Sequence, residues 1–147
     1  MAPAQFSIRV RFYELDPYGH VNHATYLQYF EAARVAWLAE VGQGLDELKA
    51  ADVQLVVTGL ATRFVRSAVL NDECVVETAT VEAKRVRAQW AQRISLDGEL
   101  LVCQRINFAT VNTAGRPIRM PEGLLDALSQ IEAPTEWFAK QLPDLPL

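Results

Sequence analysis

The sequence has little of what several classes of protein depend on. Its 147 residues include only two cysteines, too few for a disulfide framework, and Lys plus Arg number 14 against 18 Asp plus Glu. The formal charge of −4 offers no cationic surface for a nucleic-acid backbone, so we expect no nucleic-acid partner. No window approaches the roughly 18 consecutive apolar residues of a membrane span, so no such span is predicted.

Signals for export and for metal or phosphate chemistry are also missing. Residues 1–6 carry neither a basic patch nor an apolar stretch of signal-peptide length, which indicates a cytoplasmic protein. Cys74 and Cys103 lie inside apolar runs typical of strands, so we expect buried thiols rather than a disulfide. The cysteines and the two histidines lack zinc-ligand spacing, and neither a Gly-x-Ser-x-Gly elbow nor a phosphate-binding glycine loop occurs. We therefore predict no metal site.

The residues that are present suffice for one compact domain. Hydrophobic residues make up 50% of the chain and charged residues 22%. A chain of this length buries roughly 68–70% of the surface that it would expose when unfolded. We predict a single domain over residues 1–147, with a core at about 5–128. Residues 129–147 form a proline-containing tail with Trp137 and Phe138, which we expect to pack weakly or fray.

Hydrophobic periodicity predicts one long helix and five strands. Apolar residues recur at spacings of three and four over residues 23–41, the pattern of an amphipathic helix, and shorter helices are expected at 45–51 and 121–128. Alternating or β-branched runs predict strands at 6–12, 53–65, 74–83, 88–96 and 100–111.

Packing rules then favour a two-layer fold. One amphipathic helix laid against a five-stranded, mainly antiparallel sheet lets every element bury one face, so the predicted class is α+β. Asp97-Gly98, between the last two strands, is the residue pair favoured by a type I′ hairpin turn. Trp37 and Trp90 are expected in the core between helix and sheet.

Polar side chains gather at the expected start of the long helix. Asp16, His20, Asn22 and His23 fall within eight residues and include both histidines of the chain. A helix N-terminus presents unpaired N–H groups and the positive end of the helix dipole, which can polarise a carbonyl oxygen. A purely structural interpretation is equally open: Asn22 caps the helix, Asp16 starts a turn and the histidines are surface residues.

A longer motif surrounds these residues. It comprises Tyr13-Glu14-Leu15-Asp16-Pro17-Tyr18-Gly19-His20-Val21-Asn22-His23-Ala24-Thr25-Tyr26, continued by Tyr29, Glu31 and Arg34. This motif resembles the signature of the hotdog-fold acyl-CoA thioesterases of the 4-hydroxybenzoyl-CoA thioesterase and YbgC type. Looser similarity continues in residues 69–73 and 116–121, so the resemblance covers roughly residues 5–128.

The resemblance implies a fold, an activity and an assembly. In that family a five-stranded sheet wraps around the long helix, and two subunits pair edge to edge with active sites at the interface. We therefore expect a homodimer or homotetramer that hydrolyses an acyl thioester of CoA or of acyl carrier protein. The implied catalytic residues are Asp16, as nucleophile or general base, with Tyr13 and His23 assisting. No cofactor is implied, since CoA is part of the substrate.

Further residues are implied on the substrate side. Gly19 lets the backbone approach the thioester, and the backbone amide of His23 is our candidate donor to the carbonyl oxygen. The motif also places three more substrate-binding positions, at His20, Asn22 and Tyr26. His23 stands where many relatives have a second asparagine, so its side chain either assists catalysis or caps the helix.

Basic residues near strand ends are candidates for the phosphates of CoA. One pair is Arg63 and Arg66, and Arg85 and Arg87 lie beside Lys84 in a turn. Solvated strand ends are the alternative interpretation. On the helix, Glu31 and Arg34 are expected to form an ion pair at spacing i,i+3, with Glu31 a reserve catalytic carboxylate.

Two other functions stay open at this point. A hotdog hydratase or dehydratase also places an aspartate and a histidine near the helix, but with a different spacing. A non-catalytic acyl-CoA sensor would keep the cleft without requiring the carboxylate of Asp16.

Overall fold

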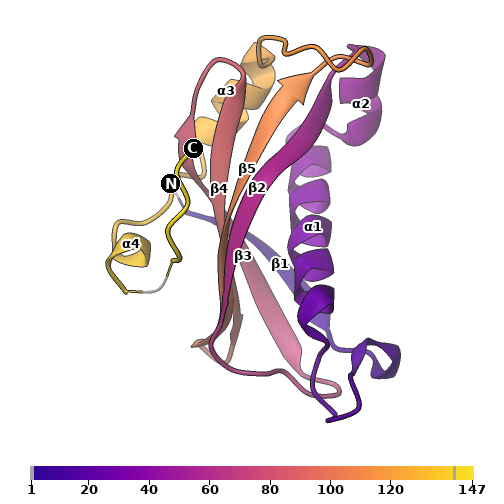
Figure 1. The fold of residues 1–147 in the computed structure, drawn as a ribbon, viewed down its shortest axis with the longest axis vertical. Helices are drawn as coiled ribbons and strands as arrows, with labels where there is room; N and C mark the ends of the chain where they lie inside the picture. The colour runs from indigo at the N-terminus through magenta and orange to yellow at the C-terminus, as the bar shows by residue number, and fades with distance from the viewer. Residues whose placement is uncertain (1, 141) are drawn as a thin grey trace.

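The computed structural model describes residues 2–140 and 142–147 (Figure 1). Its elements follow in chain order: β1 (Ala4–Arg9), η1 (Phe12–Glu14), α1 (His23–Glu40), α2 (Leu45–Ala50), β2 (Gln54–Phe64), β3 (Glu73–Ala83), β4 (Arg87–Leu96), β5 (Glu99–Val111), α3 (Glu122–Ser129) and α4 (Glu136–Lys140). The five strands form one antiparallel sheet in the order β1-β3-β4-β5-β2. The predicted α+β class is confirmed.

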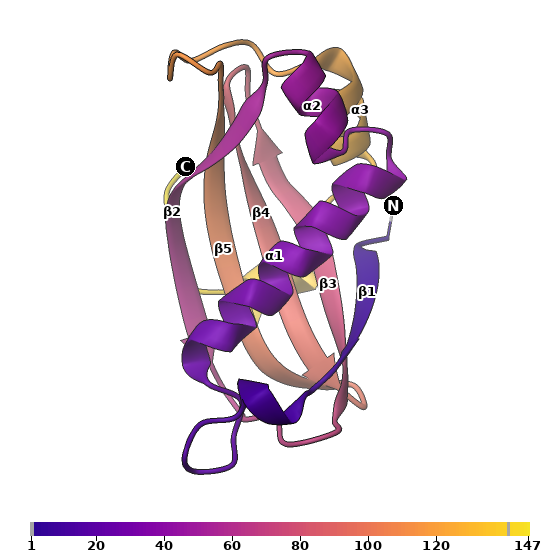
Figure 2. The ribbon, with the colours of Figure 1, turned by 90° about the vertical axis from the view of Figure 1, so that its right-hand side faces the viewer.

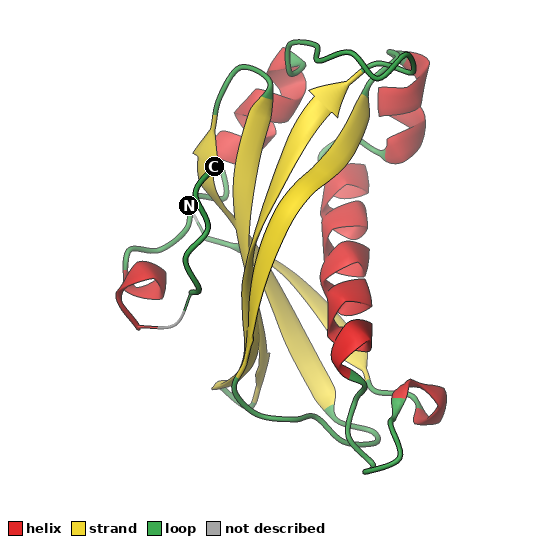
Figure 3. Cartoon of the chain, viewed as in Figure 1, coloured by secondary structure: helices red, strands yellow, loops and turns green. Residues whose placement is uncertain are grey.

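Helix α1 covers one face of this sheet. Figures 1 and 3 show it lying along that face, and Figure 2 shows that it crosses the strands obliquely. Its buried residues include Tyr26, Phe30, Ala33 and Trp37, whose spacing of three and four residues turns one stripe toward the sheet. The helix ends before Gly42, whose φ of +75° is a left-handed conformation that glycine adopts without strain.

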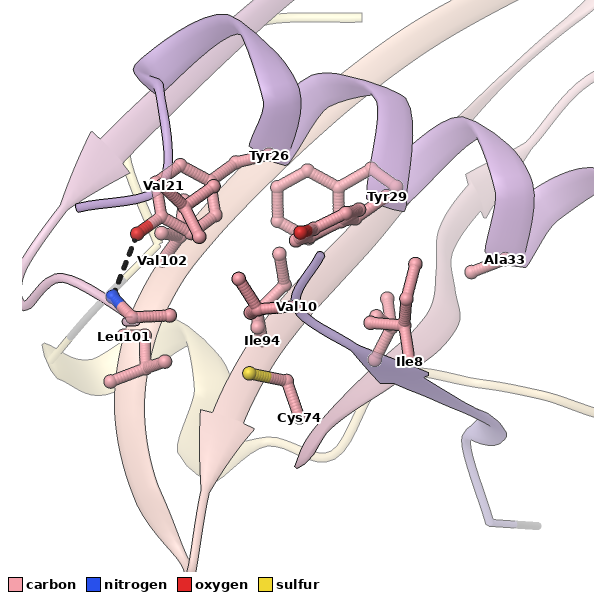
Figure 4. Close-up of a cluster of buried hydrophobic side chains, with 13 residues drawn as sticks. Ile8, Val10, Val21, Tyr26, Tyr29, Ala33, Cys74, Ile94, Leu101 and Val102 are labelled. Carbon is pink, nitrogen blue, oxygen red and sulfur yellow. Dashed lines mark hydrogen bonds between the residues drawn. The ribbon is translucent and has the colours of Figure 1, made fainter. Parts of the chain in front are cut away.

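The core between α1 and the sheet has two clusters. The cluster under the first half of α1, drawn in Figure 4, includes the fully buried Phe30 with Tyr29 and Ile94. The second lies under the other half, where the Trp37 and Trp90 rings meet edge to face with centroids 6.1 Å apart. The prediction that both tryptophans are core residues is therefore confirmed.

The hairpin and both thiols also match expectation. Asp97 and Gly98, between β4 and β5, have φ of +50° and +81°, the positive values that a type I′ turn requires at both positions. Cys74 and Cys103 are buried and neither is in a disulfide. None of the described helices is both long and apolar enough to cross a membrane.

The first strand is shorter than predicted. The alternation continues through Phe12, but β1 ends at Arg9 and residues 12–14 form the turn η1. Glu14 causes this change, because its Oε1 accepts the Arg11 N–H at 2.8 Å while its own N–H donates to the Arg11 carbonyl at 3.0 Å. This local pair of bonds replaces further pairing with the sheet.

The prediction that the C-terminal tail packs weakly was wrong. Trp137 is only 3% exposed and Leu142 only 7%, and both pack on the face of the sheet opposite α1. Figure 1 shows this segment, in yellow, on that opposite side. Outward-facing side chains of the sheet bind its backbone, since the carbonyls of Pro143, Leu145 and Pro146 accept hydrogen bonds from Arg105, Gln89 and Asn107.

The predicted ion pair on α1 is also absent. Among the described residues no salt bridge joins Glu31 to Arg34. Arg34 instead turns into the interface, where its Nη1 donates to Gln92 Oε1 at 2.8 Å and its guanidinium lies 5.9 Å from the centroid of the Trp90 ring. Burial lowers the pKa of Arg34 to about 10. The helix periodicity predicts Arg34 near the edge of the buried stripe. In the structure its side chain lies between α1 and the sheet, because Gln92 of β4 accepts its hydrogen bond there.

Candidate active site

Asp16 lies in a tight turn directly before α1. Its Oδ1 accepts the backbone N–H groups of Tyr18 at 2.9 Å and His20 at 3.2 Å, while the Asp16 N–H donates to the His20 carbonyl at 2.7 Å. The chain reverses at Gly19, whose φ is +79°. No hydrogen bond from the described residues reaches Oδ2. One carboxylate oxygen is therefore held rigidly by the backbone, and the other is available for chemistry.

The start of α1 leaves one N–H group open. Asn22 caps the helix, which is the structural alternative that the sequence left open, since its Oδ1 accepts the Ala24 N–H at 2.9 Å and its carbonyl accepts the Thr25 N–H at 2.9 Å. The N–H of His23 has no acceptor among the described residues. It stands at the positive end of an 18-residue helix, where a developing negative charge is stabilised.

A surface cavity of about 230 Å³, here called the Asp16 cavity, joins these groups. It is lined by Asp16, His20, Val21, His23, Tyr26, Phe64, Val65, Arg66 and Ser67. The first five come from the predicted motif and the other four from the end of β2 and the segment after it. Two parts of the chain that lie about 40 residues apart thus enclose one site.

Aromatic rings form one wall of the Asp16 cavity. The half-exposed Phe64 ring meets the His23 ring edge to face, with centroids 6.4 Å apart, and lies 5.9 Å from the Tyr26 ring. The Tyr26 hydroxyl accepts the Ala68 N–H at 2.9 Å, the bond dashed in Figure 4, and so ties α1 to the segment after β2. Burial raises the pKa of Tyr26.

A second tyrosine of α1 braces the chain that leads into the turn. The buried Tyr29 donates its hydroxyl hydrogen to Glu14 Oε1 at 2.7 Å. Burial raises the pKa of Tyr29 above its usual value, and the hydrogen bond to Glu14 adds to this effect. Glu14 also pairs with Arg11 at 3.0 Å, and the Glu14 carbonyl accepts the Asn22 N–H. These contacts fix both ends of the Asp16 turn.

Comparison with known proteins identifies the family. A family model described as the thioesterase-like superfamily matches residues 10–128. The chain belongs to this superfamily. It is 29% identical to the long-chain acyl-CoA thioesterase FadM of Escherichia coli over 123 residues, which cover 82% of this chain and 92% of that protein. It is 28% identical to the acyl-CoA thioesterase YbgC of Haemophilus influenzae over 129 residues, which cover 86% of this chain and 95% of that protein.

A solved structure supports the same assignment. The thioesterase of Thermus thermophilus, crystallised with coenzyme A and zinc, matches this chain with a TM-score of 0.77 and 28% identity, covering 90% of this chain and 97% of that one. The predicted hotdog-type thioesterase resemblance is confirmed, as is the prediction of a thioester hydrolase. In our protein, no group of three or more His, Cys, Asp or Glu among the described residues could hold a metal ion.

Not every predicted site residue reaches the Asp16 cavity. Tyr13 lies in η1, is 68% exposed and stacks edge to face with Phe12 outside the cavity. Arg85 lies in the turn from β3 to β4, where its carbonyl accepts the Met120 N–H, and Arg87 is the first residue of β4. That turn is at the end of the sheet away from Asp16. Within one chain none of these three residues lines the Asp16 cavity.

The other basic pair is closer. Arg66 lines the Asp16 cavity and pairs with Glu99 in an exposed ion pair, and Arg63 is exposed on β2. Sequence reasoning missed Phe64, Val65 and Ser67, which complete the cavity of the thioesterase. No local signal marks them, because their role depends on β2 ending beside the start of α1. Their position next to the proposed phosphate-binding arginines was the one available hint.

Proposed function

We propose that this chain is an acyl-CoA thioesterase whose reaction takes place in the Asp16 cavity. One observation carries the proposal: a carboxylate oriented by two backbone N–H groups and an unpaired helix N–H belong to the same cavity. A thioester carbonyl placed between them meets a negative group and an electrophilic N–H together. The superfamily membership and the names of its relatives support thioester hydrolysis as the reaction.

In the proposed reaction the thioester oxygen accepts a hydrogen bond from the His23 N–H. Negative charge develops on that oxygen as the carbonyl carbon is attacked, and one oriented donor stabilises it by roughly 2.7–4 kcal/mol. Asp16 either removes a proton from the attacking water or attacks the carbon itself to form a mixed anhydride that water then hydrolyses. In both routes the C–S bond breaks, the CoA thiolate takes up a proton and the free acid leaves. No cofactor takes part.

The surrounding residues have proposed roles in binding. The His23 and Phe64 rings flank the thioester, and Gly19 allows the chain to approach it closely. His20 and Asn22 orient the turn and the helix start. Arg66 and Arg63, near the cavity, attract the phosphates of CoA, and the exposed Tyr13 and Arg85 with Arg87 remain predictions for contacts outside the Asp16 cavity.

We also propose that two copies pair through β2. This strand is 11 residues long, bonds to β5 along one edge and has no strand along the other among the residues that the structure describes. Apolar side chains along it and just beyond are 42–51% exposed, namely Val56, Val57, Leu60, Phe64 and Val65. A long apolar free edge is a template for another strand, and a second copy of β2 satisfies it in antiparallel pairing.

The decisive experiment is Asp16→Asn, which keeps the shape and the acceptor oxygen but removes the charge. With an acyl-CoA panel, we expect the wild type to release thiol and the variant to lose about 10²–10⁴-fold in kcat with little change in KM. Asp72→Asn is the matched control, because Asp72 Oδ2 also accepts a turn N–H, from Val69, outside the Asp16 cavity. Binding of acyl-CoA without thiol release by the wild type would favour the sensor or hydratase instead.

A further inference from the structure

A row of polar side chains crosses the inner face of the sheet beneath the middle of α1. Four neighbouring strands contribute one residue each, and these lie opposite one another in the sheet register: Thr78, Gln92, Gln104 and Thr62, here called the polar row. Gln92 is fully buried and Gln104 is only 1% exposed. Buried amides are costly unless they are hydrogen-bonded, so the polar row calls for an explanation.

The polar row separates the two clusters of the core. On one side of it the strands carry Ile94 and Val102, which belong to the cluster under the first half of α1 (Figure 4). On the other side they carry Trp90 and Ile106, which belong to the second cluster. The apolar contact between α1 and the sheet is thus interrupted halfway along the helix.

Gln92 uses every hydrogen-bonding position of its amide. Its Nε2 donates to the Phe30 carbonyl at 3.0 Å and to Thr78 Oγ1 at 3.0 Å. Its Oε1 accepts from Arg34 Nη1 at 2.8 Å and from Gln104 Nε2 at 3.3 Å. An amide has two donor hydrogens and two lone pairs on its oxygen, so all of its capacity is used. Two of the four bonds go to α1, one to its backbone and one to a side chain.

These bonds fix the position of α1 along its own axis. Apolar packing has no direction, so an apolar stripe by itself holds a helix on a sheet without selecting one axial position. A hydrogen bond needs a donor–acceptor distance near 2.9 Å and a nearly straight angle, so it does select one. Carbonyls inside a helix already accept a helical N–H, and Gln92 adds a second donor to the Phe30 carbonyl from the sheet. The helix is thereby tied to β4.

The geometry of the Asp16 cavity depends on this position. Phe30 follows His23 by about two turns of α1, and a helix rises 1.5 Å per residue, so about 10 Å of regular helix connects them. The His23 N–H belongs to α1, whereas Phe64 and Arg66 face it from the end of β2 and the segment after it. A shift of α1 by about 1 Å would move the donor relative to that wall, and misplacement of this size costs about 10²-fold in rate.

We propose that Gln92 is a positioning residue of this thioesterase, which holds α1 where the His23 N–H can meet the thioester oxygen. The inference rests on the proposed function, because that function supplies the oxygen. Arg34 and Gln104 complete the arrangement, since their bonds to Oε1 turn the Nε2 of Gln92 toward Phe30. Gln92 does not line the Asp16 cavity, so it acts through the helix and not on the substrate.

The outer face of the same strand offers a matched control. Gln89 is also a buried amide of β4, at 2% exposed. Its Nε2 donates to Asn107 Oδ1 at 2.7 Å and to the Leu145 carbonyl at 2.8 Å, and its Oε1 accepts from Arg105 Nη1 at 3.1 Å. Gln89 thus bonds the C-terminal segment in the way that Gln92 bonds α1. The same substitution at both positions separates the position of the helix from the burial of a glutamine.

The first test compares Gln92→Glu with Gln89→Glu. A carboxylate at position 92 stays ionised beside Arg34 and still accepts its bond, but it has no hydrogen to donate and repels the Phe30 carbonyl. We expect kcat of Gln92→Glu to fall about tenfold or more while KM stays within about threefold, because the donor is needed chiefly in the transition state. Gln89→Glu should stay within about twofold in both constants. Each variant is assayed well below its own Tm.

The start of the helix can also be observed directly. In ¹⁵N-labelled protein the backbone amide resonance of His23 reports the surroundings of the proposed donor. It should move in Gln92→Glu and keep its wild-type position in Gln89→Glu. A role of Gln92 in stability alone would lower Tm in both variants without a selective change at His23.

A second variant removes the polar network altogether, so that the test does not depend on Gln92→Glu folding. This apolar variant combines Arg34→Met, Thr78→Val, Gln92→Leu and Gln104→Leu. Replacing all partners of a buried polar network by apolar side chains of similar size is often neutral or stabilising, so we expect Tm at or above that of the wild type. Its kcat should still fall about tenfold or more, because apolar packing alone no longer selects one position of α1.

The outcomes separate this inference from the proposed function. A wild type that releases no thiol from any acyl-CoA contradicts the proposed function. With an active wild type, the inference alone is overturned by a wild-type kcat in Gln92→Glu or in the apolar variant, by an equal loss in Gln89→Glu, or by an unmoved His23 resonance. Failure of both inner-face variants to fold also overturns it, because the polar row would then serve the fold itself. A loss of kcat confined to the inner-face variants, with a shifted His23 resonance, supports it.

Discussion

The two faces of the sheet are covered by segments of very different character. The inner face is covered by α1, an 18-residue helix whose buried stripe packs through large side chains such as Phe30 and Trp37. The outer face offers small residues, Ala79, Ala91 and Cys103, and is covered by the C-terminal segment. There, side-chain donors of the sheet bind backbone carbonyls. A long helix thus covers the face that carries the site, whereas the short helix α4 and the extended residues after it cover the other.

The difference shows two ways of burying a sheet. A helix satisfies its own backbone hydrogen bonds, so it needs only an apolar stripe to cover a face. An extended segment leaves its carbonyls unpaired, so the sheet must supply donors. Gln89, Arg105 and Asn107 do this and are linked to each other, since Arg105 donates to Gln89 and Gln89 to Asn107. The outer face is therefore more polar than a core, although Gln89 and Asn107 are only 2% and 7% exposed.

The largest effect is expected from the inner face. Phe30→Ala removes a ring that is fully buried between α1 and the sheet, so it should lower the free energy of unfolding by about 3–5 kcal/mol. Urea denaturation followed by circular dichroism measures this loss. A loss below 1 kcal/mol would mean that α1 is held by contacts other than the apolar stripe.

A substitution on the outer face should lower stability less, and it should loosen only the C-terminal segment. Trp137→Ala removes the main apolar contact that holds the C-terminal segment on the sheet. We expect the packing of this segment to be favoured by a free energy of roughly 1–2 kcal/mol, because each of its hydrogen bonds contributes modestly. Buried Cys103 should then react faster with a thiol reagent, while Cys74 under α1 stays protected. Thioesterase activity should be retained because Trp137 lies on the face away from Asp16. Equal acceleration at both cysteines would show global unfolding instead.

Alkaline pH should weaken the inner face through Cys74. Burial raises the pKa of this thiol to about 11 from its usual 9. The folded protein thus keeps the proton over a range where the unfolded chain releases it, so the associated stability is present below pH 9 and lost as pH rises toward 11. We expect a decline of about 1–2 kcal/mol between these values. Cys74→Ala should flatten this part of the profile, measured by denaturation at each pH.

The smallest effect is expected at the N-terminal end of α1, the helix that covers the inner face. Asn22→Ala removes the side-chain bond to the Ala24 N–H, which should cost about 1 kcal/mol of stability. Asn22→Asp keeps the acceptor and should restore most of it in the same denaturation assay. If the alanine variant is as stable as the wild type, water or a rearranged turn satisfies the helix start.

Local sequence patterns predicted most of the elements for identifiable reasons. The helix over 23–41 and the turn at Asp97-Gly98 depend on interactions between residues close in sequence, and both are confirmed. Glu14 ended the first strand early because its carboxylate competes for the backbone of Arg11. The inward position of Arg34 was missed because its partner, Gln92, comes from a strand far along the chain.

The site divides in the same way. By itself the sequence determined the Asp16 turn, the capped start of α1 and the stripe that packs on the sheet, because these depend on short-range bonds and on periodicity. Only the tertiary structure decided which residues close the Asp16 cavity, where the C-terminal segment packs and that Tyr13, Arg85 and Arg87 do not line this cavity. Those outcomes depend on strand order and register, which bring together residues that are far apart in the sequence. No local sequence pattern indicates such contacts.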